Sequence, residues 1–290
     1  MNPVTLWWKA IRPATLMAGG VPVVVATALA HGHEKFDWWV AVLCLLGALL
    51  IQIGTNFAND YYDFIKGADT ADRLGPQRAT QQGWVRPEQM KRATYVALGL
   101  ALLVGLVLIW RGGWPIALLG CASLLLAVGY TGGPFPLAYL GLGDLFVLAF
   151  FGLGATAGTY WLLTFSLPSC VWFAGFALGA LATAILVVNN LRDRHTDAAA
   201  GKKTLAVRWG SRAARIEYVA LVVSAYGAVV AGVVEGALPD TALWVLACLP
   251  QAAICSWHVL WRDGRELNPL LGATARLETV FGLILAMAVI

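Results

Sequence analysis

Long apolar runs alternate with short polar segments along the whole chain. From these runs we predict nine membrane-spanning helices, at about residues 14–31, 38–58, 92–110, 114–131, 142–164, 169–190, 214–234, 240–260 and 273–290. An α-helix needs roughly 20 mainly apolar residues to cross a bilayer, and each run is close to that length. The pattern therefore predicts an all-α polytopic membrane protein, built as one domain over residues 1–290.

The composition agrees with this class and constrains the topology. Hydrophobic residues make up 59% of the chain and charged residues only 12%, with a mean hydropathy of +0.72; a soluble domain carries about 25% charged residues. In this topology, all Lys and Arg residues except Lys35 and Arg111 lie on the same side of the membrane as the N-terminus. The positive-inside rule then predicts a cytoplasmic N-terminus. The net charge of +4 does not indicate nucleic-acid binding, because the basic residues lie in loops between spans.

The N-terminal region allows a second interpretation. Residues 1–13 suit a short interfacial segment, since Trp7 and Trp8 fit the headgroup level and Lys9 and Arg12 fit a cytoplasmic surface. The first apolar run also resembles a secretory signal peptide, with A-L-A at residues 28–30 as a cleavage site. We favour a retained first helix because it makes the topology consistent.

A first cluster of polar residues follows the second apolar run, in the string N-D-Y-Y-D-F-I-K-G-A-D. If the helix continues through it, Asn59 and Asp63 are i, i+4 neighbours on one face. Gly67 is a plausible stop, after which Asp69 can turn back toward the same place. Carboxylates at the end of a membrane helix are costly unless they are paired, solvated or bound to metal.

A second cluster, N-N-L-R-D-R-H-T-D, follows the sixth run. Asn189 and Asp193 repeat the spacing of the first cluster, and Asp193 and Asp197 are again i, i+4. The chain thus divides into two similar halves, each with an Asn/Asp motif after an even-numbered helix, which suggests internal duplication. We predict that the two acidic sites face each other across the bundle.

The residue types of these clusters suit a magnesium–diphosphate site. Mg²⁺ prefers oxygen ligands and is typically held by one or two carboxylates together with substrate phosphates. Basic residues that can contact phosphate oxygens follow both motifs: Lys66, Arg73 and Arg78 after the first, Lys202 and Lys203 after the second. The bundle also holds thirteen Trp and eight Tyr, whose aromatic faces can stabilise the carbocation left by an allylic diphosphate. A lipid-tailed diphosphate fits both features.

Other polar residues are weaker candidates. Tyr139, Asp144, Gln81 and Gln82 are second-rank candidates for contact with substrate. Asp144 could equally cap the fifth span. Asp72 and His195 are open between a site role and a surface role, and Asp37, Asp240 and Asp263 are predicted to be solvated helix ends.

The motifs resemble a known family. N-D-x-x-D and D-x-x-x-D look like the two aspartate-rich motifs of the UbiA-type intramembrane prenyltransferases. Three longer strings resemble its 1,4-dihydroxy-2-naphthoate polyprenyltransferase branch, which acts in menaquinone synthesis: N-D-Y-Y-D-F-I-K-G-A-D-T-A-D-R-L-G-P-Q-R-A-T-Q-Q-G, Y-T-G-G-P-F-P-L-A-Y-L-G-L-G-D and N-N-L-R-D-R-H-T-D-A-A-A-G-K-K-T-L-A-V-R-W-G. The resemblance covers nearly the whole chain.

This resemblance implies a nine-helix bundle in a bacterial inner membrane, with a central cavity open to the cytoplasm and a lateral opening to lipid. The implied substrates are polyprenyl diphosphate and 1,4-dihydroxy-2-naphthoate, joined with loss of diphosphate and CO₂. The implied Mg²⁺ ligands are Asn59, Asp60, Asp63, Asp69, Asn190, Asp193 and Asp197, with Asp63, Asp193 and Lys66 as catalytic residues. The spacing from Asp63 to Asp69 exceeds that of ubiquinone-pathway relatives and leaves the role of Asp69 open.

Three alternatives remain at this stage. The same fold could prenylate another acceptor, such as 4-hydroxybenzoate, homogentisate, chlorophyllide or haem. A secondary transporter also has duplicated halves and polar residues in membrane helices, but its site is expected near the bilayer midplane rather than at helix ends. A non-catalytic scaffold that binds prenyl lipids is the third.

Overall fold

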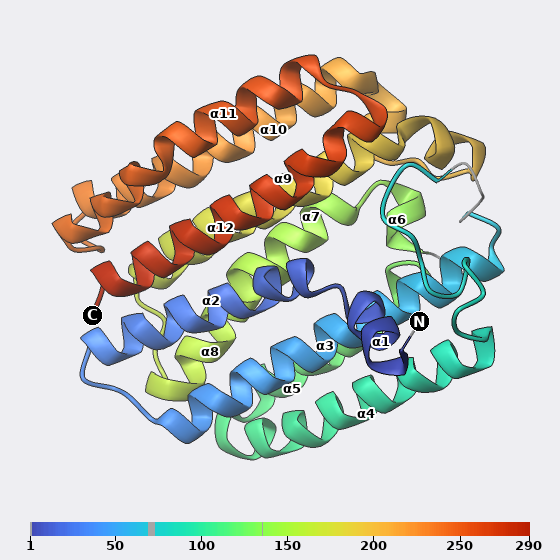
Figure 1. Cartoon of the computed structure of the whole chain (residues 1–290). Helices are drawn as coiled ribbons and strands as arrows, with labels where there is room; N and C mark the ends of the chain where they lie inside the picture. The colour runs from blue at the N-terminus through green and yellow to red at the C-terminus, as the bar shows by residue number, and fades with distance from the viewer. Residues whose placement is uncertain (1, 69–72, 135) are drawn as a thin grey trace.

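The computed structural model describes residues 2–68, 73–134 and 136–290, and within these ranges the chain forms helices and no strand. The elements, drawn in Figure 1, are α1 (Pro3–Ile11), α2 (Pro13–Gly32), α3 (Trp38–Ile65), α4 (Pro87–Gly112), α5 (Trp114–Gly129), α6 (Leu137–Leu140), α7 (Gly143–Val147), η1 (Leu148–Gly154), α8 (Ala155–Thr164), α9 (Ser169–Ala199), α10 (Leu205–Val234), η2 (Asp240–Cys248), α11 (Leu249–Trp261), η3 (Gly264–Leu267) and α12 (Asn268–Ala288). The short segment η1 is a π-helix, and η2 and η3 are 3₁₀-helices.

The predicted nine-helix membrane bundle is confirmed in the described part of the chain. Eight helical segments are long and apolar enough to cross a membrane, and α5 is a shorter apolar helix of 16 residues. The fifth predicted span is a composite of α7, η1 and α8, and the eighth and ninth each begin with a 3₁₀ segment. The chain is therefore a multi-pass integral membrane protein.

The two helices that carry the motifs extend beyond the apolar runs that predicted them. Helix α3 is capped by Asp37, whose side chain accepts from the backbone N–H of Trp39 at 3.1 Å, and it continues to Ile65. Gly67 follows with φ +68°, a left-handed conformation that favours glycine. Helix α9 likewise continues to Ala199. Both motifs are therefore helical, as the i, i+4 spacing predicted.

Helix α9 forms the centre of the packing and contacts α2, α7, η1, α8, α10 and α12. Its buried side chains Leu178, Leu181 and Val188 have no solvent-exposed surface. On one side its backbone approaches the π-helix so closely that a Cβ on Gly152 would lie 2.4 Å from the Cα of Gly179. Small residues that allow such close approach are typical of membrane helix interfaces.

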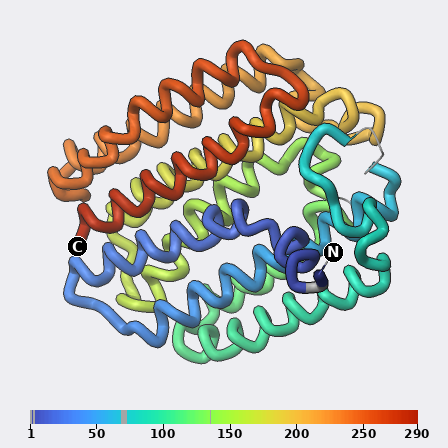
Figure 2. Tube along the Cα trace, in the orientation of Figure 1, coloured from blue at the N-terminus to red at the C-terminus, as the bar shows by residue number. Residues whose placement is uncertain are grey.

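Both ends of the bundle carry exposed tryptophans. Figures 1 and 2 show that α1, α6 and the segment between α3 and α4 lie at one end, whereas the C-terminus and the α2–α3 connection lie at the other. Exposed tryptophans mark the first end at Trp8, Trp209 and Trp261 and the second at Trp110 and Trp114. Aromatic belts of this kind are typical of the two membrane–water interfaces.

Candidate active site

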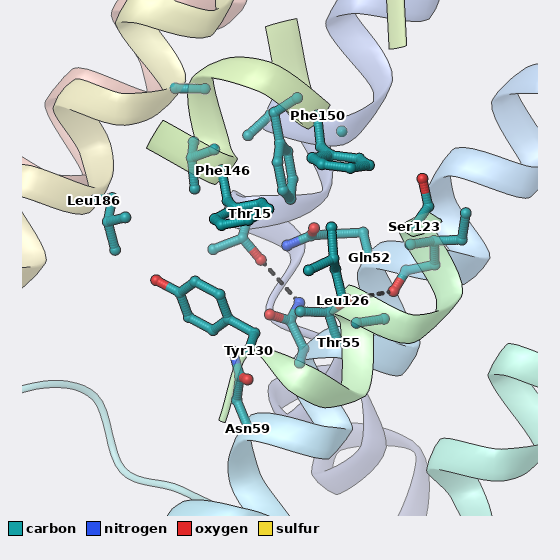
Figure 3. Close-up of a pocket in the computed structure, with 18 of the residues that line it drawn as sticks. Thr15, Gln52, Thr55, Asn59, Ser123, Leu126, Tyr130, Phe146, Phe150 and Leu186 are labelled. Carbon is teal, nitrogen blue, oxygen red and sulfur yellow. Dashed lines mark hydrogen bonds between the residues drawn. The ribbon is translucent and has the colours of Figure 1, made fainter. Parts of the chain in front are cut away.

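A cavity of about 610 Å³ lies inside the bundle. Its wall comes from α2, α3, α4, α5, the α7–η1–α8 segment and α9. Most of the lining is apolar, and the charged lining residues come mainly from the end of the bundle where both motifs lie. Figure 3 shows part of this wall, with Thr15, Gln52, Phe146, Phe150 and Leu186 among the labelled residues.

The structure brings the two acidic motifs together through one lysine. Lys202 Nζ lies 3.4 Å from Asp63 Oδ1 at the end of α3 and 3.3 Å from Asp197 Oδ1 at the end of α9. The chain turns into this position at Gly201, where φ is +76°. All three side chains line the cavity. Residues 134 positions apart in sequence thus form a single charged site.

Each motif also has an arginine of its own. Arg78 Nη2 donates to Asp63 Oδ2 at 2.9 Å, and both side chains are buried. Arg192 donates to both oxygens of Asp193, at 2.8 and 2.5 Å. A buried ion pair needs such additional hydrogen bonds to offset the loss of hydration. The site therefore presents alternating buried charges at the polar end of an apolar cavity.

Arg192 is a site residue that the sequence reasoning did not select. Its side chain is 1% exposed, and besides Asp193 it donates to Asn189 Oδ1 at 2.6 Å and to Asn268 Oδ1 at 3.1 Å. A Cβ on Gly75 would meet the guanidinium at 2.5 Å. An arginine inside a run of Asn and Asp at a membrane helix end is a usable signal, since such charges seek partners.

Asp60 lies apart from the other predicted metal ligands. Its oxygens accept hydrogen bonds from the backbone N–H groups of Ala79 and Thr80, at 3.0 and 3.1 Å. The side chain is 1% exposed and is not part of the cavity wall. Its neighbour in the motif, Asp63, points to the cavity instead. Asp60 therefore anchors the segment that carries Arg78 in this structure, and its role as a metal ligand stays a prediction.

The remaining predicted ligands lie as follows. Asn59 lines the cavity, with its amide oxygen accepting from the hydroxyl of Thr131 at 2.9 Å. Asn190 and Asp193 also line it and are buried. Asp69 and Asp72 lie outside the described residues.

Lys66 and Tyr139 lie beside the cavity rather than in its wall. Lys66 Nζ donates to the carbonyl of Thr131 at 2.6 Å. The same atom lies 4.7 Å from the centre of the Tyr139 ring, and Lys202 Nζ lies 5.4 Å from that centre. The pKa of Lys66 is lowered because its ammonium is partly removed from water, while the carboxylate of Asp63 opposes that shift. Tyr139 thus supports both lysines through cation–π contacts.

The other basic and polar candidates divide into two groups. Arg73 and Asp144 line the cavity. Lys203, Gln81 and Gln82 do not, and Gln82 instead donates to Gln81 at 2.8 Å.

The oxygen ligands present fit a hard cation. Among described residues no three His, Cys, Asp or Glu side chains form a ready metal cluster. Arg78, Arg192 and Lys202 are paired with the carboxylates. Asp63 Oδ1 is buried and accepts no hydrogen bond, although Lys202 Nζ lies 3.4 Å from it. Carboxylate and amide oxygens around one cavity end are the donor set that Mg²⁺ takes when it shares a site with phosphates.

Fold and site together define a class: a helical intramembrane protein with a buried acid–base site above an apolar cavity. The comparison with known proteins identifies the family. Residues 20–271 match the model of the UbiA prenyltransferase family, and the chain belongs to that family. The resemblance of the two motifs is thereby confirmed.

Relatives and solved structures agree. The chain is 38% identical to 1,4-dihydroxy-2-naphthoate octaprenyltransferase of Mycobacterium tuberculosis, covering 97% of this chain and 96% of the relative. It is 35% identical to the Haemophilus influenzae protein of the same name, covering 98% and 96%. A UbiA homolog from Aeropyrum pernix shares the fold with a TM-score of 0.71 at 16% identity, covering 94% and 96% of the two chains. A homolog from Archaeoglobus fulgidus bound to GPP and Mg²⁺ gives 0.66 at 15% identity, covering 97% and 99%.

Proposed function

We propose that this protein transfers a polyprenyl group from polyprenyl diphosphate to 1,4-dihydroxy-2-naphthoate, with loss of diphosphate and CO₂, giving the demethylmenaquinone skeleton. The observation that carries the proposal is the meeting of both acidic motifs at Lys202, at the polar end of an apolar cavity. An amphiphilic diphosphate matches that arrangement. The full-length relatives that bear this activity in their names support the choice of acceptor.

The donor diphosphate is bound by the chain's own cations. Arg73, Arg78 and Lys202 line the cavity beside the carboxylates, with Lys66 next to them. Asn59 and Asp63 from α3, with Asn190, Asp193 and Asp197 from α9, would hold Mg²⁺, and Asp69 stays a predicted further ligand. When bound, Mg²⁺ supplies positive charge that offsets the charge developing on the leaving diphosphate. The lysine and arginine side chains contact phosphate oxygens directly.

The prenyl chain then occupies the apolar part of the cavity. Its reacting end faces the rings of Tyr130, Phe146 and Phe150, which all line that space and face it in Figure 3. Aromatic faces favour positive charge near them. The ring carbon that bears the carboxylate attacks C1 of the prenyl group as the bond from C1 to the diphosphate oxygen breaks. Loss of CO₂ then leaves its electron pair on the ring.

We also propose that the motif end of the bundle faces the cytoplasm across a bacterial inner membrane. The basic residues support this orientation: the site end holds Arg73, Arg78 and Lys202, whereas Arg111 lies at the other end and pairs with Asp37 at 3.5 Å.

The packing of α9 against helices of both halves supports one domain rather than two.

The test is release of diphosphate and CO₂ by the purified protein, given 1,4-dihydroxy-2-naphthoate, a polyprenyl diphosphate and Mg²⁺. Equal release of both products, abolished by EDTA, supports the proposal. Diphosphate without CO₂ would retain the donor site and reject the acceptor. Neither product from a folded sample, combined with uptake of a solute into vesicles, would favour the transporter.

A further inference from the structure

Asp144 is an unused carboxylate in the wall of the cavity. Its side chain is buried, with 7% of its surface exposed, and it lines the same cavity as the acidic motifs. No hydrogen bond reaches its Oδ1 atom in the described structure. A carboxyl oxygen that is buried without a hydrogen bond is costly, so a residue of this kind inside a membrane protein is a candidate for a functional site.

The local backbone holds Asp144 in this position. Gly141 has φ +73°, and a Cβ there would lie 2.4 Å from the carbonyl oxygen of Lys203. A Cβ on Gly143 would lie 2.8 Å from the hydroxyl oxygen of Tyr130. The G-L-G-D sequence thus lets α7 begin directly against Tyr130. The Tyr130 side chain points into the cavity in Figure 3.

The chemistry of the missing partner follows from charge. A carboxylate repels a diphosphate, so the ligand group that meets Asp144 must be a hydrogen-bond donor. Besides Asp63 Oδ1, which lies in the charged site, Gln52 Oε1 on α3 is a further buried acceptor without a hydrogen bond in the wall of this cavity. Asp144 Oδ1 and Gln52 Oε1 together match a ligand with two O–H groups, which is the chemistry of a hydroquinone ring.

We propose that Asp144 is the general base that activates the prenyl acceptor, an inference that rests on the proposed function. Asp144 takes the proton from the ring hydroxyl next to the attacked carbon. The oxygen's electron pair forms a ketone as that carbon bonds to C1 of the prenyl group and diphosphate leaves. When CO₂ departs, the C–CO₂ electron pair restores the aromatic ring, and the proton returns from Asp144 to the oxygen. The side-chain oxygen of Gln52 accepts a hydrogen bond from the other ring hydroxyl.

The electrostatic surroundings suit this role. Tyr130 and Glu217 are ionisable groups within electrostatic reach of Asp144. Neither is a cation, and among the described residues no ion pair neutralises the Asp144 carboxyl in the way that Asp63 and Asp193 are neutralised. It remains free to accept a proton from the acceptor ring and to give it back.

The chain offers a matched control. Glu278 on α12 is a fully buried carboxyl whose two oxygens also have no hydrogen-bond partner, but it is not part of the cavity wall. Asp144→Asn and Glu278→Gln therefore remove one buried carboxyl each, and only the first lies where the acceptor binds. Asp144→Ser is a second variant for the case in which the amide folds poorly, and Asp144→Glu restores the base.

The experiment measures prenylated product and CO₂ against pH for these variants, with donor and Mg²⁺ saturating, together with binding of the prenyl diphosphate alone. Asp144→Asn should lower kcat about 10²-fold or more, the usual contribution of a general base. Its rate relative to the unmodified protein should rise with pH, because an acceptor hydroxyl that ionises in solution needs no base. Donor binding should stay within twofold, Asp144→Glu should recover part of the rate, and Glu278→Gln should behave like the unmodified protein.

Two results would overturn the inference: a rate within twofold for Asp144→Asn and Asp144→Ser, or a loss that is the same at every pH. Failure of the proposed function looks different, since the unmodified protein itself would then release no CO₂ from the naphthoate. That outcome would reject the acceptor and the role of Asp144 together.

Discussion

Asp60 and Asp63 belong to the same motif, yet the structure gives them separable roles. Replacing Asp60 with Ala removes two buried hydrogen bonds to backbone N–H groups, at 3.0 and 3.1 Å. A hydrogen bond to a charged group contributes about 1.5–3 kcal/mol, so the folded state should lose about 3–6 kcal/mol. At about 2 °C per kcal/mol for a chain of this size, Tm should fall by about 6–12 °C.

Thermal unfolding of the detergent-purified variants, alongside initial rates titrated with Mg²⁺, measures both roles. Asp60→Ala should lower Tm and leave the Mg²⁺ concentration for half-maximal rate unchanged below the transition. Asp63→Asn should instead raise that Mg²⁺ concentration at least tenfold, on the order of the loss seen when metal sites are altered. An unchanged Tm in Asp60→Ala, together with a shifted Mg²⁺ requirement, would refute the anchoring role and favour a role for Asp60 as a metal ligand.

Two further predictions test the charges around the site and at its rim. Lys202→Met keeps most of the apolar side chain but removes the cation that lies 3.3–3.4 Å from both motifs. KM for the prenyl diphosphate should therefore rise about tenfold, the equivalent of one lost charged contact. An unchanged KM would contradict direct contact. The hydrogen bond from Arg194 lowers the pKa of Asp263. The stability that this pair contributes is therefore fully present above the ordinary aspartate pKa. It is lost as the pH falls through the lowered pKa of the folded state. Because Asp263 is 46% exposed, Asp263→Asn should cost less than about 1 kcal/mol at neutral pH, and a Tm difference that persists in acid would contradict the ion pair.

The apolar runs were enough to predict the bundle. All nine runs became helical segments, because burial of backbone polar groups in lipid leaves few other solutions. The polar continuation of α3 and α9 was visible only through the i, i+4 spacing of the motif residues. The π-helical segment η1 was not predicted, and its Gly152 packs against Gly179, which is distant in the sequence.

The candidate site was predicted in its residue types but not in its pairing. The family resemblance grouped Asp60 with Asp63, whereas the fold turns Asp60 toward the backbone of Ala79 and Thr80. Arg192 lies inside the second motif, where its contacts with Asn189 and Asp193 are local. Its contact with Asn268, 76 residues away, is set by tertiary packing, which no local pattern encodes. Lys202 illustrates the opposite case: its place after the second motif was a sufficient signal.

The central claim is that the two motifs form one metal–diphosphate site. A structure of the protein with Mg²⁺ and a non-hydrolysable prenyl diphosphate analogue tests it most directly. We expect Mg²⁺ at about 2.1 Å from oxygens of Asp63 on α3 and of Asp193 or Asp197 on α9, with the diphosphate against Lys202. A diphosphate bound to one motif alone, or outside the cavity, would contradict it.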